Sequence, residues 1–249
     1  MPFVLHCLSS HLSGIIIFHL TMKFKKIISI SKEIIGLDKL TIFFDTSEEG
    51  KRIYKYFNSR HPRYLIIRNK TVGVAIIKTT DFTNEEGYLK SVNGKNSAAY
   101  FCRKALKAGY VFSELDPVKY SDAIYTINNS SNSRQGREMD SAYKKRDLVY
   151  PINNQNVYFG IFKGDDLVAY VWFVKSGELL LLNRVMGHAN HLDFGVVYLL
   201  MTSAVQHCIK YYSEVKYAMY DTFFGASDGL KLFKKRCGFK PYKVVWKIK

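Results

Sequence analysis

The chain has 249 residues, which suits one large domain or two modest ones. Hydrophobic residues make up 47% and aromatic residues 15%, so the chain can bury a core and intrinsic disorder is excluded. The 37 Lys and Arg against 21 Asp and Glu leave a net charge of +16, which favours a polyanionic partner: tRNA, other nucleic acid, an acidic membrane face or a phosphorylated cofactor.

The first 21 residues differ from the rest of the chain, since they contain three histidines and no Lys or Arg. Their apolar run is too short and too interrupted to cross a bilayer, and no basic region precedes it. Met22 then opens "MKFKKIISISKEIIG", which is typical of the start of a cytoplasmic protein. We expect translation to begin at Met22 and residues 1–21 to be a mis-annotated or disordered extension; a degenerate membrane anchor is the alternative.

No other segment reaches the ~18 apolar residues of a transmembrane helix, so we expect a cytoplasmic protein without stable membrane insertion. The cysteines lie far apart and form no CxxC pair, which suggests neither a zinc site nor a disulfide framework: Cys7, Cys102, Cys208 and Cys237. His188 and His191 have a spacing that suits a metal, but no Glu or Cys accompanies them, and no metal is expected.

Residues 22–115 are expected to form an α+β region. "RYLIIRNKTVGVAIIKTT" (63–80) is rich in β-branched residues and broken by "RNKT", which predicts a β-hairpin. "TNEEGYLKSVNGKN" (83–96) is polar and predicts a loop. "SAAYFCRKALKAG" (97–109) has a helical period and stops at a glycine, and "YVFSEL" (110–115) predicts a strand.

Residues 116–249 are expected to form a second domain. Asp116 and Pro117 are the N-cap and first residue of a predicted helix over 116–129, and "RQGREMDSAYKKR" (134–146) predicts a short basic helix. The remaining residues predict elements in the order β-β-β-α-β-α-β. The first three strands are a hairpin over 156–174, which turns at Lys163 to Asp166, and a strand at 179–185. The other elements are a helix from Leu192 to Tyr212, a strand at 215–221, a short helix at 227–237 and a closing strand at 238–249. The long helix has an apolar stripe of Leu192, Val196, Leu199, Leu200, Ala204 and Cys208.

The junction "RVMGHA" (184–189) leads from a strand into this helix through Arg184, Gly187 and Ala189. One interpretation is packing, because small residues let a helix begin close to a sheet. The other is chemical, because a helix start directs unpaired backbone N–H groups and the positive end of the helix dipole at an anion.

The element order, the RxxGxA pattern at 184–189 and the closing "GLKLFKKRCGFKPYKV" (229–244) resemble the GNAT superfamily of acyltransferases. The resemblance implies an α/β fold, a mixed and largely antiparallel sheet flanked by helices, over residues 116–249. Residues 22–115 would then be a degenerate second GNAT-like half, because the hairpin over 63–80 echoes the one over 156–174.

In that family a Q/R-x-x-G-x-G/A loop caps the central helix, and its amides hold the pyrophosphate of acetyl-CoA. The resemblance therefore implies acyl-CoA as co-substrate, at a donor site of Arg184, Val185, Gly187, His188, Ala189 and Asn190. In an alternative register the helix begins at Asn190 as N-cap, and the glycine only packs the helix start.

"YAMYDTFFGASDGLKLFKKRCGF" (217–239) further resembles the FemAB-type branch, whose GNAT-like domains take their donor from aminoacyl-tRNA. Three functions follow as alternatives. The first is an acyl-CoA-dependent transferase acting on an amine or hydroxyl of a small molecule, sugar or protein. The second is a FemAB-type transferase using charged tRNA, which the positive charge supports. The third is a non-catalytic binding protein on a GNAT scaffold.

Acyl transfer to an amine needs a proton acceptor, donors for the oxyanion and an acid for the leaving group. Many GNAT members carry a tyrosine acid in the helix before the final "GF", where this chain has Phe233. We expect Tyr220 and Asp221, at the end of a strand, to replace it. Direct attack is expected, since no GxSxG elbow is present and Cys237 lies in the turn "KKRCGF".

The acceptor site is expected beside the predicted basic helix, where Arg134 and Arg137 could bind a phosphate or carboxylate, together with Glu138. The later run of Lys231, Lys234, Lys235 and Arg236 indicates a solvated helix face.

Overall fold

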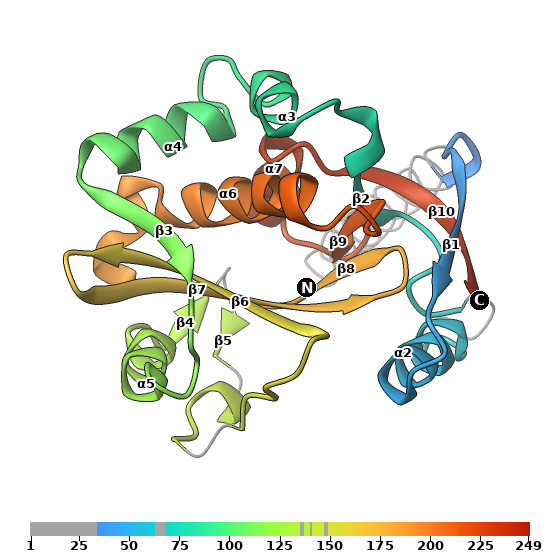
Figure 1. The fold of residues 1–249 in the computed structure, drawn as a ribbon, viewed down its shortest axis with the longest axis horizontal. Helices are drawn as coiled ribbons and strands as arrows, with labels where there is room; N and C mark the ends of the chain where they lie inside the picture. The colour runs from blue at the N-terminus through green and yellow to red at the C-terminus, as the bar shows by residue number, and fades with distance from the viewer. Residues whose placement is uncertain (1–33, 63–67, 135–136, 140, 147–148) are drawn as a thin grey trace, which may run out of the picture. The chain divides into compact units, whose positions relative to one another are not determined.

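The computed structural model describes residues 34–62, 68–134, 137–139, 141–146 and 149–249 (Figure 1). Residues 39–249 form one compact unit. The predicted extension 1–21 and the start at Met22 lie outside the described residues, as does the first strand of the hairpin predicted over 63–80. Within the described residues, no helix is both long and apolar enough to cross a membrane.

An eight-stranded sheet organises the compact unit, in the order β1-β10-β2-β9-β8-β7-β6-β3. The pairs β1·β10 and β8·β9 are parallel and the others antiparallel, which confirms the mixed, largely antiparallel sheet. The strands are β1 Lys39–Phe44, β2 Val74–Lys78, β3 Tyr110–Glu114, β6 Asn156–Lys163, β7 Asp166–Ser176, β8 Leu179–Gly187, β9 Tyr217–Thr222 and β10 Lys240–Ile248.

Helices flank this sheet, and a small hairpin accompanies it. The α-helices are α2 Glu48–Asn58, α3 Glu85–Ser91, α4 Ala98–Lys107, α5 Ser121–Asn129, α6 Val196–Tyr211 and α7 Asp228–Arg236. Short 3-10 helices are η1 Thr79–Asp81, η2 Ser141–Tyr143 and η3 Ala189–Phe194, and the hairpin pairs β4 Ser133–Arg134 with β5 Arg137–Glu138.

The C-terminal element order β-β-β-α-β-α-β is confirmed, from β6 to β10. β7 is buried continuously from Leu167 to Val171, because α5 and α6 both pack on it and lie on opposite sides of the sheet (Figure 1). A strand covered on both faces loses the alternation of apolar and polar residues that a half-exposed strand shows. The hydrophobic effect therefore anchors the centre of the sheet.

The N-terminal region differs from its prediction in two places. Residues 83–96 contain the helix α3, not only a loop, because the Asn84 side chain caps it by accepting from Gly87 N, 2.9 Å, and Tyr88 is completely buried. The second place is β2, which pairs with β9 and β10, partners that the prediction did not name. Strands from both predicted regions, 22–115 and 116–249, thus share one sheet.

The segment 116–146 also departs from the prediction. Asp116 does accept from Val118 N and Lys119 N, but these bonds close a turn, and α5 begins only at Ser121. The predicted basic helix over 134–146 was wrong: the chain forms the β4–β5 hairpin, closed by Met139 N donating to Asn132 O, 3.0 Å, and then η2. Glycine at position 136 weakens a helix there.

The long helix was predicted from Leu192, but α6 begins at Val196. Gly195 has φ +84°, in the left-handed region that glycine adopts readily, and this residue separates η3 from α6. The predicted stripe is buried from Val196 to Cys208, whereas Leu192 is 46% exposed because it belongs to η3.

Candidate active site

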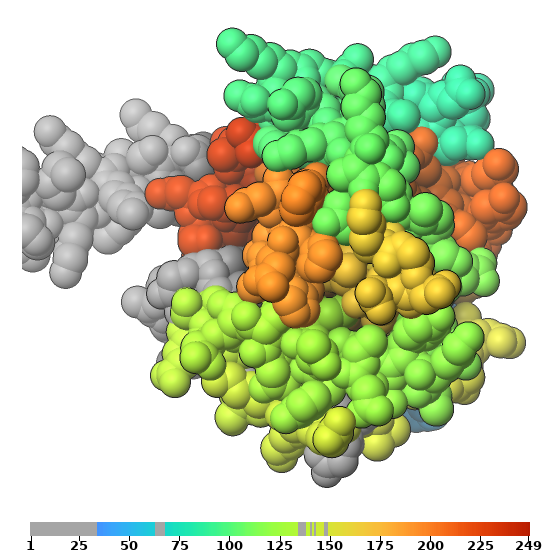
Figure 2. Space-filling model, turned by 90° about the vertical axis from the view of Figure 1, so that its left-hand side faces the viewer, coloured from blue at the N-terminus to red at the C-terminus, as the bar shows by residue number. Residues whose placement is uncertain are grey.

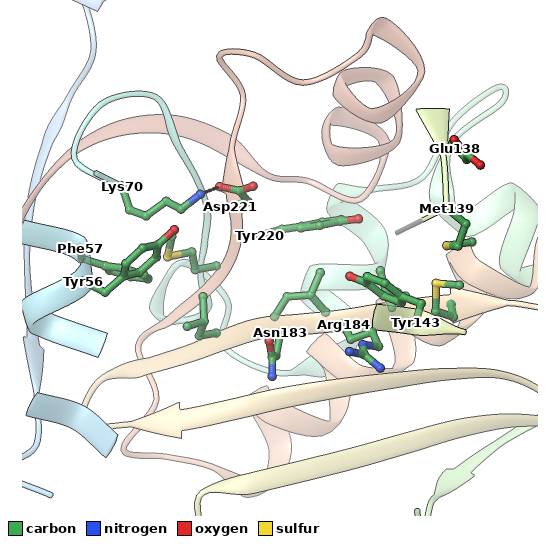
Figure 3. A pocket seen from close by; sticks show the side chains of 15 residues that line it. Tyr56, Phe57, Lys70, Glu138, Met139, Tyr143, Asn183, Arg184, Tyr220 and Asp221 are labelled. Atoms are coloured by element: carbon green, nitrogen blue, oxygen red, sulfur yellow. Dashed lines mark hydrogen bonds and ion pairs between the residues drawn. The ribbon is translucent and has the colours of Figure 1, made fainter. Parts of the chain in front are cut away.

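A cavity of about 590 Å³ lies where β8 and β9 separate. These parallel strands pair through Leu179–Leu181 and Tyr217–Met219, and beyond this point their pairing ends. Five parts of the chain supply the walls (Figure 3): α2 with Tyr56 and Phe57, the loop before β2 with Lys70, the β5–η2 segment with Glu138, Met139 and Tyr143, β8 from Leu181 to Met186, and β9 with Met219, Tyr220 and Asp221.

The structure places some of the predicted site residues at the cavity and others away from it. The cavity brings together Glu138, Arg184, Val185, Tyr220 and Asp221, whereas Gly187, His188, Ala189 and Asn190 are not among the residues that line it. Arg134 and Arg137 pair through their backbones in the β4–β5 hairpin, and their side chains lie outside the described part of the structure.

Lys70 and Asp221 form an ion pair at one end of the cavity. Both residues have positive φ, +22° for Lys70 and +52° for Asp221, a conformation that is uncommon for residues other than glycine. Trp246 Nε1 donates to Lys70 O, 2.7 Å, and so ties the loop to β10. Backbone strain of this kind, maintained by the surrounding contacts, clusters at functional sites.

Lys234 on α7 is completely buried behind Tyr220. Its Nζ donates to Thr222 O, 2.7 Å, and lies 4.7 Å from the centroid of the Tyr220 ring. Burial lowers the pKa of Lys234 to about 8; Asp221 opposes this shift and Lys70 adds to it. In Figure 3 the Tyr220 hydroxyl end points into the cavity. A cation is therefore held directly against the ring of the tyrosine that was expected to move a proton.

The assignment of Lys234 to a solvated face was wrong. It lies at i+4 from Leu230 and three residues before the buried Cys237, a spacing that places all three on one side of a helix. That periodicity was the signal that could have identified it.

Arg184 reaches the cavity from β8, under the ring of Tyr143. Its guanidinium carbon is 4.2 Å from the centroid of that ring. The nitrogen Nη1 is buried and has no hydrogen-bond partner among the described residues.

The predicted donor loop has its amides engaged within the protein. His188 N donates to Val168 O, 2.8 Å, Ala189 N to Ser130 Oγ, 3.0 Å, and Asn190 N to His188 Nδ1, 3.3 Å. These bonds leave no amide of the three free for a pyrophosphate. The contacts of Gly187 agree with the packing interpretation of the junction, because a Cβ at this position would lie 2.9 Å from Leu192 Cδ2.

The start of α6 is covered as well. A Cβ at Gly195 would lie 2.9 Å from Phe101 Cβ on α4, and Lys104 Nζ donates to Asp193 O, 2.7 Å. Figure 2 shows this face, with the orange segment that includes η3 between α4 above, in green, and residues 116–146 below, in yellow-green. The residues present therefore do not fit a cradle for the pyrophosphate of acyl-CoA at this junction.

Two other side chains weighed from the sequence lie in the core. Phe233 packs between Tyr198 and Tyr220, with ring centroids 4.8 Å and 6.3 Å away. Cys237 is completely buried, and burial raises the pKa of its thiol well above the ordinary value. A nucleophilic thiol needs the opposite shift.

Comparison with known proteins gives likeness in structure only, since no family model and no curated protein sequence matches the chain. The crystal structure of FemX matches with a TM-score of 0.54 and 9% identity, over 78% of this chain and 65% of that one. The C-terminal domain of a putative lysylphosphatidylglycerol synthetase from Agrobacterium fabrum matches with a TM-score of 0.48 and 13% identity, over 69% and 58%. A GCN5-related N-acetyltransferase from Kribbella flavida matches with 0.42 and 14%, over 68% and 54%.

The chain thus spans between about half and two thirds of the length of these proteins. At such identities a likeness shows the fold and not the activity. The mixed sheet, its order of elements and the match to FemX agree with the resemblance that the sequence indicated. The chain has a fold similar to that of FemX.

Proposed function

We propose that this protein is a transferase that moves an acyl or aminoacyl group to an amine or hydroxyl acceptor in the cavity between β8 and β9. The observation that carries the proposal is the convergence of Tyr220, Lys234 and Arg184 at the point where the two strands separate. Such a site offers a proton-transfer group, cations and backbone donors within one enclosed space.

In the proposed reaction the acceptor nitrogen or oxygen attacks the carbonyl carbon of the donor directly, and no covalent enzyme intermediate forms. The bond from the carbonyl carbon to the acceptor forms, and the bond to the donor's leaving oxygen or sulfur breaks. Residues 182–185 of β8 lie beyond its pairing with β9, so backbone N–H groups on this edge of the strand can donate to the oxyanion. The acceptor loses one proton and the leaving group gains one.

Tyr220 is the best candidate for moving this proton. The Asp221 carboxylate is already paired with Lys70, which suits it to positioning the end of β9. Lys234 places its ammonium 4.7 Å from the centroid of the Tyr220 ring, so its positive charge lies next to the group proposed to move the proton.

Aminoacyl-tRNA is the donor that we favour. The engaged amides of residues 188–190 and the cover of α4 over the start of α6 argue against a pyrophosphate at the predicted loop. The net charge of +16 supports contact with a nucleic-acid backbone. The likeness to FemX agrees with this choice at the level of the fold. Acyl-CoA is the second candidate, because the RxxGxA pattern does stand at a strand-to-helix junction.

Two binding measurements separate these donors. Bulk tRNA should bind with an affinity that falls steeply as salt is raised, and acetyl-CoA should leave the melting temperature unchanged. A melting temperature that rises with acetyl-CoA, without binding of tRNA, would select acyl-CoA. Binding of neither would favour a non-catalytic protein on the same scaffold.

Tyr220→Phe tests the chemistry. It should slow loss of label from bulk charged tRNA, with cell extract as the source of acceptor, by roughly 10²–10⁴, the usual contribution of general acid–base catalysis. Tyr217→Phe on the same strand is the matched control, because Tyr217 does not line the cavity. Full activity in Tyr220→Phe together with its loss in Cys237→Ala would point to a thiol intermediate instead.

A further inference from the structure

Arg184 is a partly buried cation that has no ion-pair partner among the described residues. Of the described residues, none places a carboxylate oxygen within 4.0 Å of its nitrogens. Two acidic side chains are among those that line the cavity: Asp221 is held by Lys70, and Glu138 is exposed to solvent.

The phenols around Arg184 do not supply the missing charge. Burial raises the pKa values of Tyr150, Tyr158 and Tyr170, so all three stay neutral near pH 7. The Tyr170 hydroxyl donates to Asn128 Oδ1, 2.8 Å, and its oxygen can accept from the Arg184 guanidinium, but a neutral phenol adds no negative charge.

Three donors in this cluster lack partners. Besides Nη1 of Arg184, the Asn128 Nδ2 and the Tyr150 hydroxyl are buried without a hydrogen bond among the described residues. A buried polar group without a partner costs about 1–3 kcal/mol, and a native protein seldom retains several together without reason. Of these three residues, Arg184 is the one that lines the cavity, so an acceptor atom that enters the cavity can approach its guanidinium.

Arg146 shows what a structural arginine looks like in this chain. It too lies over a tyrosine, 5.0 Å from the centroid of the Tyr125 ring, but it is exposed and bonds Asp122 Oδ1 through Nη2, 2.9 Å. Arg184 has the same kind of aromatic neighbour without the carboxylate, and it faces a cavity.

We infer that Arg184, lying under Tyr143, is the binding site for an anionic group of the acceptor, a carboxylate or a phosphate. The ring of Tyr143 covers one face of the guanidinium, and the donors in the guanidinium plane match the paired oxygens of such a group. The anion supplies the counter-charge that none of the described residues provides. That the anion belongs to the acceptor rests on the proposed function; the anion site itself does not.

The test uses sodium acetate and inorganic phosphate as separate probes, with ionic strength held constant by sodium chloride. Either probe should raise the melting temperature of the full chain in a saturable way, and the one that acts at lower concentration identifies a carboxylate or a phosphate site. Arg184→Met should abolish the saturable rise, and Arg184→Lys, which keeps the charge but loses the planar pair of donors, should weaken it.

Arg146→Met is the matched control and should keep the full response, which also separates binding from the general stabilisation that phosphate gives most proteins. An identical response in wild type and Arg184→Met, or no saturable response in wild type, would overturn the inference. The result does not depend on transfer: an Arg184-dependent rise in a protein that transfers nothing would leave the anion site standing and reject the proposed function.

Discussion

Replacing Lys234 by methionine tests whether burial of this charged lysine beside Tyr220 lowers the free energy of unfolding. Its pKa falls from the ordinary 10.5 to about 8, chiefly because burial disfavours the charged form. A difference of this size corresponds to on the order of 3 kcal/mol of folding free energy, at about 1.4 kcal/mol for each pKa unit. Methionine has a similar length and no charge, so Lys234→Met removes the disadvantage.

The sign follows from proton binding. Below pH 8 the folded and unfolded chains both carry the proton, and the folded state bears the whole penalty. Between pH 8 and 10.5 the folded chain has lost the proton and the unfolded chain still binds it, so stability rises with pH in this window. Above pH 10.5 the penalty from this group is gone.

The variant also loses the hydrogen bond to Thr222 O, which offsets about 1 kcal/mol of the gain. We therefore expect Lys234→Met to raise the free energy of unfolding at pH 7 by about 1–2 kcal/mol. Urea unfolding at pH 7, 9 and 10 measures the difference between the two proteins, which should shrink and then reverse as pH rises. Lys235→Met, at the exposed neighbouring position, is the control and should change little.

Two results would refute this reasoning. One is a loss of stability in Lys234→Met at pH 7. The other is a difference between wild type and variant that stays constant from pH 7 to 10, which would mean that Lys234 titrates in the folded protein as it does in water.

Three further substitutions test the fold and the junction by urea unfolding. Gly187→Val should lower the free energy of unfolding by about 1–3 kcal/mol, because its Cβ would lie 2.9 Å from Leu192 Cδ2; an unchanged midpoint would remove the packing argument. Gly177→Ala should lower the free energy of unfolding by at least about 2 kcal/mol, because φ is +55° and the new Cβ would lie 2.4 Å from a backbone oxygen. Gly164→Ala is the control and should lower it less, because φ is similar, +59°, but no atom lies within 4 Å of the new Cβ. Asn84→Ala should lower it by about 1 kcal/mol through loss of the α3 cap, and no loss would mean that the cap is dispensable.

Candidate site residues could be predicted from the sequence only where they lie toward the end of a single strand. Tyr220 and Asp221 come directly after the buried part of β9, and Arg184 lies on β8 after a run of leucines, so their places followed from the local pattern. Lys70 and Tyr56 line the same cavity but come from elements with no motif. Their approach depends on β2 entering the sheet between β9 and β10.

The predicted donor loop could also be predicted only in part from the sequence. Its residues were identifiable as a strand-to-helix junction, and the structure does place η3 and α6 directly after β8. Whether the amides at 188–190 are free was not encoded locally, because their partners include Val168 O and Ser130 Oγ, tens of residues away along the chain.

The sequence by itself determined the order of elements from β6 to β10, because turn residues, alternation and helical period act over a few neighbours and are visible in the letters. Only the tertiary structure decided that α3 forms around the buried Tyr88, that the Lys234 ammonium lies against the Tyr220 ring, and that Nη1 of Arg184 has no hydrogen-bond partner among the described residues. Burial and pairing are properties of contacts between distant segments, and they set the pKa values and unpaired donors from which the chemistry of the site is argued.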